Sequence, residues 1–122
     1  MKEIKAIIRP FMLDPVLDAL HGIAGLPGVT VSEARAVSVE RGHYEQVVKA
    51  KLEVMVPDAL VEPVLQAIRK NAHTGNPGDG RIFVIPIEET VRIRTGERGM
   101  SEVSVAEAAP PREQGGTAGK PA

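Results

Sequence analysis

VVKAKLEVMVPDALVEPVLQAI, residues 47–68, contains both of the hydrophobic periodicities on which the fold depends. Every second residue from Val48 to Val56 is apolar, which is typical of a half-buried strand. Lysine, glutamate and methionine lie between these residues and belong to the opposite face. From Pro57 onward the apolar residues follow helical spacing as far as Ile68 and form one stripe. The stretch therefore predicts a strand that leads directly into an amphipathic helix.

The residues before this stretch predict a strand, a helix and a second strand. Apolar residues alternate over 4–8, which indicates a strand. Asp14 and Pro15 then suit the N-cap and the first position of a helix. Valines favour a strand over residues 29–39, and the polar residues 40–46 predict a loop that connects it to the next strand.

The residues after the stretch predict a turn, a further strand and a tail. Residues 74–80 are rich in glycine, with asparagine and proline, which is typical of a tight connection. A strand over 81–87 and a short strand over 90–93 follow. The composition then shifts to Ala, Pro, Gly, Glu and Ser, so we expect residues 99–122 to form a disordered tail.

The predicted order is strand, helix, strand, strand, helix, strand, within one domain over residues 1–98. This α+β order matches a ferredoxin-like βαββαβ sandwich. Two helices would cover one face of the sheet and leave the other bare, with Lys49, Lys51 and Glu53 on that bare face. An uncovered face on so small a domain favours a closed ring of identical subunits.

The composition excludes several classes of protein. With 122 residues, 43% of them hydrophobic, the chain can form one domain but no large enclosed active site. Aromatic residues make up 2% and the net charge is -1, which argues against a nucleic-acid partner because aromatic platforms and basic surfaces are missing. There is no cysteine, which excludes disulfides and thiolate metal sites.

The hydropathy pattern predicts a cytoplasmic protein that does not insert into a membrane. The first residues are charged and lack the apolar run of a signal peptide. No stretch approaches the roughly 20 apolar residues that a membrane helix needs.

Two segments late in the chain have residues suited to binding phosphate. Residues 74–84 combine glycines, whose backbone N–H groups can approach an anion closely, with the charge of Arg81. An ordinary turn has the same composition. Arg92 and Arg94 alternate in an extended segment and would emerge from one face, although an exposed edge strand would show the same pattern.

No pattern predicts a catalytic or metal site. His21, His43 and His73 are far apart and match no metal-ligand spacing. The chain also lacks a nucleophile–base motif and a pattern of paired carboxylates. We therefore expect a protein that is not an enzyme.

Several segments resemble the PII signal-transduction proteins, over roughly residues 1–98. Residues 74–84 are similar to the B-loop of that family, with Arg81 where lysine is usual, and residues 91–97 are similar to its C-loop. The further matching segments are residues 1–11 with 13–14, residues 28–31 and residues 54–58.

The resemblance implies a homotrimer that binds an adenine nucleotide, ATP, ADP or AMP, in the clefts between subunits. Gly78 and Gly80 would offer backbone N–H groups to the phosphates. Arg81 would bind phosphate from the same subunit, while Arg92 and Arg94 would reach in from the neighbour.

The remaining residues implied by the resemblance surround the adenine and the loop. Thr30 and the backbone near Met55 would hold the adenine, and Glu53 would pair with Arg81. The complete predicted nucleotide set is Thr30, Ser38, Glu53, Met55, Gly78, Asp79, Gly80, Arg81, Arg92 and Arg94.

The chain departs from the family between its second and third strands. The T-loop, with which family members dock onto targets, is shortened here to residues 38–47. The tyrosine that is uridylylated in some relatives lies in the missing part, and Tyr44 does not match its motif. The loop therefore retains a docking role in our interpretation, without that modification.

A second departure concerns the 2-oxoglutarate site. Glu40 stands where the family has a glutamine that helps hold Mg and the keto acid, and a carboxylate would repel that dicarboxylate. We expect weak or absent 2-oxoglutarate binding. Glu40, Lys49 and Lys51 are the candidate residues for a second ligand, with bicarbonate as a candidate anion.

Three functions remain open from the sequence. The first is a nucleotide sensor that signals through its short T-loop to a transporter or enzyme, in inorganic-carbon metabolism, metal efflux or nitrogen metabolism. The second is a slow nucleotide hydrolase, for which no general base is evident. The third is a structural trimer without a ligand, against which the arginines argue because unpaired charge around a cleft is costly.

Overall fold

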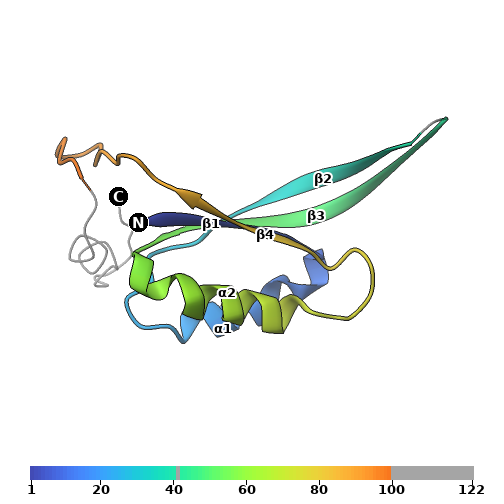
Figure 1. Ribbon diagram of the computed structural model, residues 1–122, viewed down its shortest axis with the longest axis horizontal. Coiled ribbons are helices and arrows are strands. Elements are labelled where there is room, and N and C mark those ends of the chain that lie inside the picture. The colour runs from blue at the N-terminus through green and yellow to red at the C-terminus, as the bar shows by residue number, and fades with distance from the viewer. Residues whose placement is uncertain (41, 100–122) are drawn as a thin grey trace.

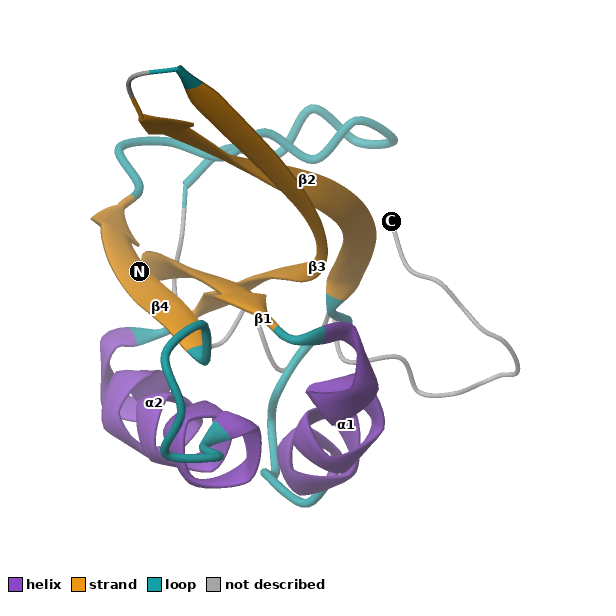
Figure 2. Ribbon diagram, turned by 90° about the vertical axis from the view of Figure 1, so that its right-hand side faces the viewer, coloured by secondary structure: helices purple, strands orange, loops and turns teal. Residues whose placement is uncertain are grey.

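Four antiparallel strands form one sheet, and both helices lie on the same face of it (Figures 1 and 2). The computed structural model describes residues 1–40 and 42–99. The strand order β2-β3-β1-β4 confirms the predicted ferredoxin-like α+β sandwich. The elements are β1 (Lys2–Ile8), a 3-10 helix η1 (Pro10–Met12), α1 (Leu13–His21), β2 (Thr30–Glu40), β3 (His43–Val56), α2 (Asp58–Ala72) and β4 (Gly80–Pro86).

The core fills the layer between the helices and the sheet and is entirely aliphatic. Alternate residues of the central strands point into it, and the apolar stripe of each helix covers them. This is the arrangement that the two periodicities predict. The buried residues are Ile4, Ala6, Ile8, Val16, Leu20, Ala50, Leu52, Val54, Val56, Val64, Ile68 and Ala72.

Neither helix begins with a side-chain cap. The prediction that Asp14 is an N-cap is wrong, because η1 runs directly into α1 and Met12 takes the cap position. In α2, the Asp58 carboxylate accepts hydrogen bonds from the Met1 amino group at 2.9 Å and from Lys2 Nζ at 3.0 Å. These two cations lower the pKa of Asp58, the amino group more strongly. Asp58 thus joins the start of α2 to β1.

The connection between β2 and β3 is a long hairpin, and the predicted loop over residues 40–46 is wrong. The ladder continues without a break from Thr30 opposite Glu53 to Glu40 opposite His43. Gly42 has a φ of +71°, which suits a tight two-residue turn. β-branched residues in both strands, with Tyr44 in β3, favour extension beyond the body of the sheet. The hairpin projects away from the helices at one end of the molecule (Figure 1).

Residues 87–99 form a compact turn instead of the predicted strand over 90–93. Val91 and Arg98 make an isolated bridge. Within it, Arg92 N donates to Glu97 O at 2.8 Å and Gly96 N donates to Arg92 O at 2.7 Å. The two ends of the segment are therefore held close together. All of the predicted tail beyond residue 99 lies outside the described residues.

The sheet face opposite the helices is open in the single chain, as the sequence predicts. Met55 and Phe83 are 44% and 42% exposed on it, although both are large and apolar. Charged side chains lie among them, and Lys5 stands directly between Glu53 of β3 and Phe83 of β4. This face is therefore a mixed apolar and charged surface.

Candidate functional site

The loop that joins α2 to β4, residues 73–79, is named here the glycine-rich loop. It begins where α2 ends at Ala72 and stops where β4 begins at Gly80. Gly75, Gly78 and Gly80 have φ values of +92°, +98° and +109°, a region that side chains with a Cβ rarely adopt. The glycines that the sequence singled out are therefore required by the backbone path itself.

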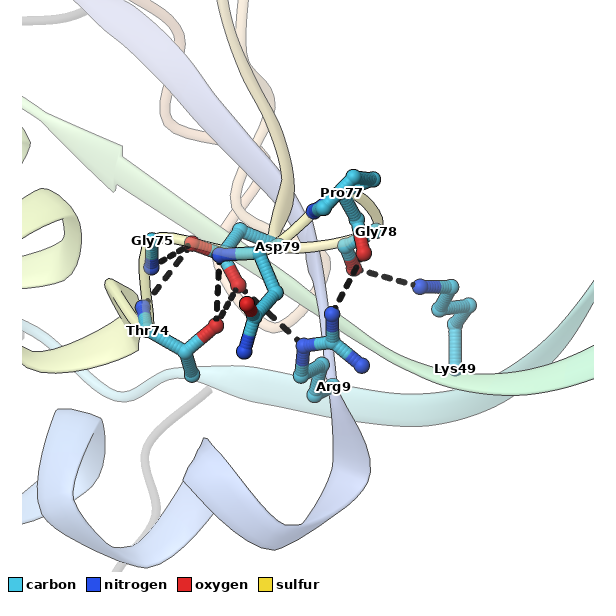
Figure 3. Close-up of polar contacts among 8 residues, drawn as sticks. Arg9, Lys49, Thr74, Gly75, Pro77, Gly78 and Asp79 are labelled. Atoms are coloured by element: carbon cyan, nitrogen blue, oxygen red, sulfur yellow. Dashed lines mark hydrogen bonds and ion pairs between the residues drawn. The ribbon is translucent and has the colours of Figure 1, made fainter.

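Asp79 organises the glycine-rich loop (Figure 3). Its carboxylate accepts hydrogen bonds from the backbone N–H groups of Thr74 at 2.8 Å and of Gly75 at 2.9 Å, and from the Thr74 hydroxyl. The Arg9 guanidinium donates to the same carboxylate at 3.1 Å. One acidic side chain thus ties the start of the loop to its end.

These hydrogen bonds hold the pKa of the Asp79 carboxyl well below its usual range, with the Thr74 hydroxyl as the largest cause. A carboxyl whose pKa is lower in the folded state stabilises the fold above its unfolded pKa, about 3.9. That stabilisation is lost as the pH falls through the lower folded value. At neutral pH the loop is therefore held by an ionised Asp79.

The thermal stability of Asp79→Asn relative to the unchanged protein is expected to depend on pH in the acid range only. The difference in unfolding temperature should stay constant from about pH 7 to about pH 4 and shrink below that, because the lost contacts require the carboxylate. Thermal unfolding of both proteins across this range provides the measurement. A difference that is already gone at about pH 6 would contradict this assignment.

Arg9 and Lys49 hold the carbonyl groups of the glycine-rich loop at Pro77 and Gly78. The sequence did not predict a role for Arg9. Arg9 Nη2 donates to the carbonyl of Pro77, and Lys49 Nζ donates to the carbonyl of Gly78 at 2.8 Å. Lys49 is one of the predicted second-ligand residues, and in the structure it contacts the loop. No sequence signal identified Arg9, since it lies just after β1 and outside both phosphate segments.

The Arg81 side chain lies on the open sheet face and makes no hydrogen bond or ion pair with any described residue. It stands opposite Ile7 of β1, and Ile7 stands opposite Lys51 of β3. Lys51 likewise has no ion pair within the described ranges. Two uncompensated cations therefore occupy one row of the sheet, separated by a strand and thus by about 10 Å.

The predicted pair between Glu53 and Arg81 is wrong. The Glu53 carboxylate lies 3.9 Å from Lys5 Nζ, and Lys5 is its direct neighbour across the β1–β3 ladder. Arg81 belongs to the row of Lys51, two residues away along β3. The register of the sheet therefore decides which cation the glutamate meets.

Arg92 and Arg94 lie in the turn over residues 87–99. Arg92 Nε is 3.4 Å from the Glu97 carboxylate, while Arg94 has no ion pair among the described residues. In the fold this turn lies at the opposite end of the molecule from the glycine-rich loop (Figure 1). A single chain therefore does not bring the two predicted phosphate segments together.

The other predicted site residues are spread along the two hairpin strands. Thr30 is the direct partner of Glu53, and Met55 follows on the same face of β3. Ser38 lies on the projecting part of the hairpin, opposite Glu45. Glu40 ends β2, and its side chain lies outside the described part of the structure.

A hollow of about 360 Å³ lies behind the glycine-rich loop, between the end of α2 and β4. Its lining combines the apolar side chains of Ile8, Ile68 and Ile82 with polar residues that include Arg69 and His73. The loop therefore has open space rather than packed side chains on this side. The lining residues are Ile8, Ile68, Arg69, Ala72, His73, Asp79, Gly80, Arg81 and Ile82.

The part of the chain that the structure describes offers neither a cluster of metal ligands nor a membrane-spanning helix. It contains no group of three or more His, Cys, Asp or Glu side chains that could hold a metal ion. None of its helices is long and apolar enough to cross a membrane.

Comparison with known proteins relates the chain to a group of regulators. The family model described as "Nitrogen regulatory protein P-II" matches residues 1–97. A protein of that name from Azospirillum brasilense is 50% identical over 109 residues, which cover 81% of this chain and 96% of the relative. Those from Mesorhizobium japonicum and Haemophilus influenzae are 50% and 45% identical over 113 and 107 residues, covering 84% and 80% of this chain and 100% and 95% of the relatives.

Proposed function

The chain belongs to the nitrogen regulatory protein P-II family, and from that premise we propose that it is a sensor of adenine nucleotides. Its relatives are named as regulatory proteins, so a signalling protein rather than an enzyme is the confirmed class. In the proposal, ATP, ADP or AMP binds at the glycine-rich loop, and the occupied site alters the β2–β3 hairpin that a target recognises.

The observation that carries the proposal is the uncompensated charge of Arg81 beside an ordered glycine-rich loop. A cation without a partner is poised to bind an anion, and charge-assisted contacts to phosphate are among the strongest hydrogen bonds in proteins. Lys51 adds a second unpaired cation on the same row of the sheet. The loop next to them is already folded, so little ordering is needed when a phosphate binds.

A homotrimer accounts for the two arginines that lie far from the loop. Arg92 and Arg94 are at the other end of the same chain (Figure 1), so they can contribute to one phosphate site only from a neighbouring subunit. A closed ring would also cover Met55 and Phe83 on the open sheet face. Both features support a nucleotide site between subunits.

The hairpin is the element that we assign to target recognition. Val39 and Tyr44 are each 73% exposed and directly opposite each other, and Val37 is 49% exposed on the same face. Exposed apolar side chains that gather on one projecting element favour a protein partner. The proposed partner is a transporter or an enzyme, which would meet a paired ribbon rather than a flexible loop.

For a second ligand we propose a small anion such as bicarbonate, bound at Lys51. Lys49 already donates to the carbonyl of Gly78, whereas Lys51 has no ion pair among the described residues. A small anion requires fewer positive contacts than the dicarboxylate 2-oxoglutarate. Regulation of inorganic-carbon metabolism is the role that such a ligand would fit.

Calorimetric titration of the full chain with ATP, ADP and AMP tests the proposed function. Each nucleotide is titrated alone, with bicarbonate and with 2-oxoglutarate, and the oligomeric state is measured by sedimentation in the same buffer. We expect saturable binding of one nucleotide per subunit in a trimer, with a larger change in affinity from bicarbonate than from 2-oxoglutarate. Absence of binding by all three nucleotides would leave only the structural trimer, and phosphate release that scales with protein would indicate a hydrolase.

A further inference from the structure

We propose that Arg9 and Lys49 are positioning residues that turn two backbone N–H groups of the glycine-rich loop outward, where an anion binds. The inference rests on the proposed nucleotide site and assigns a role to residues outside the predicted phosphate ligands. Arg9 approaches the loop from the residue after β1 and Lys49 from the neighbouring strand β3, and each donates to one carbonyl of the loop (Figure 3).

The direction of the N–H groups follows from peptide geometry. In a trans peptide the carbonyl and the next N–H point in opposite directions, and the described chain has no cis peptide bond. Arg9 holds the carbonyl of Pro77, so the N–H of Gly78 points away from Arg9. Lys49 holds the carbonyl of Gly78, so the N–H of Asp79 points away from Lys49. Neither of these N–H groups donates a hydrogen bond to any other described residue.

Consecutive N–H groups without partners form the kind of concave donor site that binds anions. Here the two carbonyls that would repel an anion are turned toward cations instead. The positive φ of Gly78 makes this path possible, and a Cβ at that position would lie 3.1 Å from Arg9 Nη2. Arg9 therefore also fills the space directly against the loop.

The position of Arg9 is itself fixed. Its backbone is extended just before Pro10, and its carbonyl accepts the Met12 N–H at 3.0 Å. The side chain is 25% exposed, and its Nε donates to Asp79, which holds Thr74 and Gly75. These polar contacts therefore tie Arg9 to both ends of the glycine-rich loop.

The test compares Arg9→Ala, Arg9→Lys and Lys49→Met with the unchanged full chain. Lys2→Ala is the matched control, because Lys2 makes an ion pair with Asp58 at 3.0 Å at the other end of β1 from the glycine-rich loop. Two quantities are measured: amide hydrogen exchange at Thr74 and Gly75 without ligand, and the affinities for ATP and for adenosine. Thermal unfolding checks that each variant is folded.

We expect Arg9→Ala to speed exchange at both amides and to weaken ATP binding by about tenfold, because charge-assisted contacts of this size are lost. Adenosine affinity should change by less than about twofold, since adenosine has no phosphate for the loop to bind. The exchange rates and the ATP affinity of Arg9→Lys should lie between those of the unchanged protein and those of Arg9→Ala. Lys49→Met should weaken ATP binding without speeding amide exchange at Thr74. The Lys2→Ala control should change neither quantity.

The outcomes separate this inference from the proposed function. Equal losses of ATP and adenosine affinity, or unchanged exchange and unchanged ATP affinity in Arg9→Ala, would overturn the positioning role. If the unchanged protein binds no nucleotide, the proposed function fails. In that case unchanged exchange in Arg9→Ala would overturn the positioning role as well, and faster exchange would support it.

Discussion

Gly80→Ala is expected to destabilise the protein by more than about 3 kcal/mol, because it combines a backbone conformation that alanine disfavours with a direct clash. Gly80 has a φ of +109°, and a Cβ built on it would lie 1.8 Å from the carbonyl oxygen of Ile7. That oxygen belongs to the backbone of β1, a central strand, so it cannot move aside as a flexible side chain can. The clash must instead separate β4 from β1 at the end where the glycine-rich loop stops and β4 begins.

Gly25→Ala is the matched control for this prediction. Gly25 also has a positive φ, +83°, but a Cβ there would meet nothing within 4 Å. Its substitution should cost only about 1–2 kcal/mol, the penalty for the left-handed backbone alone. Urea unfolding of the three proteins measures both effects. Equal destabilisation by the two substitutions would show that the close approach of β1 to Gly80 does not constrain the fold.

Arg81→Ala is expected to weaken ATP binding by about tenfold to a hundredfold while leaving the unfolding temperature nearly unchanged. The two results belong together because the Arg81 side chain makes no hydrogen bond or ion pair within the described residues. Its removal therefore costs the folded protein little, whereas a bound phosphate would lose a charge-assisted contact.

Lys2→Ala is again the appropriate control, since Lys2 is a cation with a carboxylate partner, Asp58. It should not change ATP affinity by more than about twofold, because surface ion pairs contribute little. Calorimetry gives the affinities and thermal scans give the stabilities. An Arg81→Ala protein that binds ATP as well as the unchanged protein would place the phosphates elsewhere.

The fold could be predicted because its periodicities are regular. Alternation over residues 4–8 and 47–56 and the helical stripe that follows are confirmed by the buried core. The hairpin could not be predicted in the same way, because residues 40–46 are mostly polar and the side chains of Tyr44 to Gln46 are exposed in the structure. Where no face of a strand is buried, apolar and polar residues need not alternate, so the sequence does not reveal the strand. Only Gly42, which suits a tight turn, indicated that β2 and β3 stay paired up to the turn.

The candidate site was predictable in its backbone but not in its side-chain partners. The glycines of residues 74–80 imply positive φ angles, and the structure has them. The expected Glu53–Arg81 pair failed because it depends on strand register, which places Lys5 beside Glu53. Arg9 was missed because it meets Asp79 only after the chain has folded, 70 residues away in sequence.

A nucleotide site between subunits is tested most directly by following the backbone amide resonances of the isotopically labelled full chain as ATP is added. We expect saturable shifts that are largest at Gly78 to Arg81 and at Arg92 to Arg94, two segments at opposite ends of one chain that a subunit interface would unite. Saturable binding that leaves these resonances unchanged, or no binding at all, would contradict such a site.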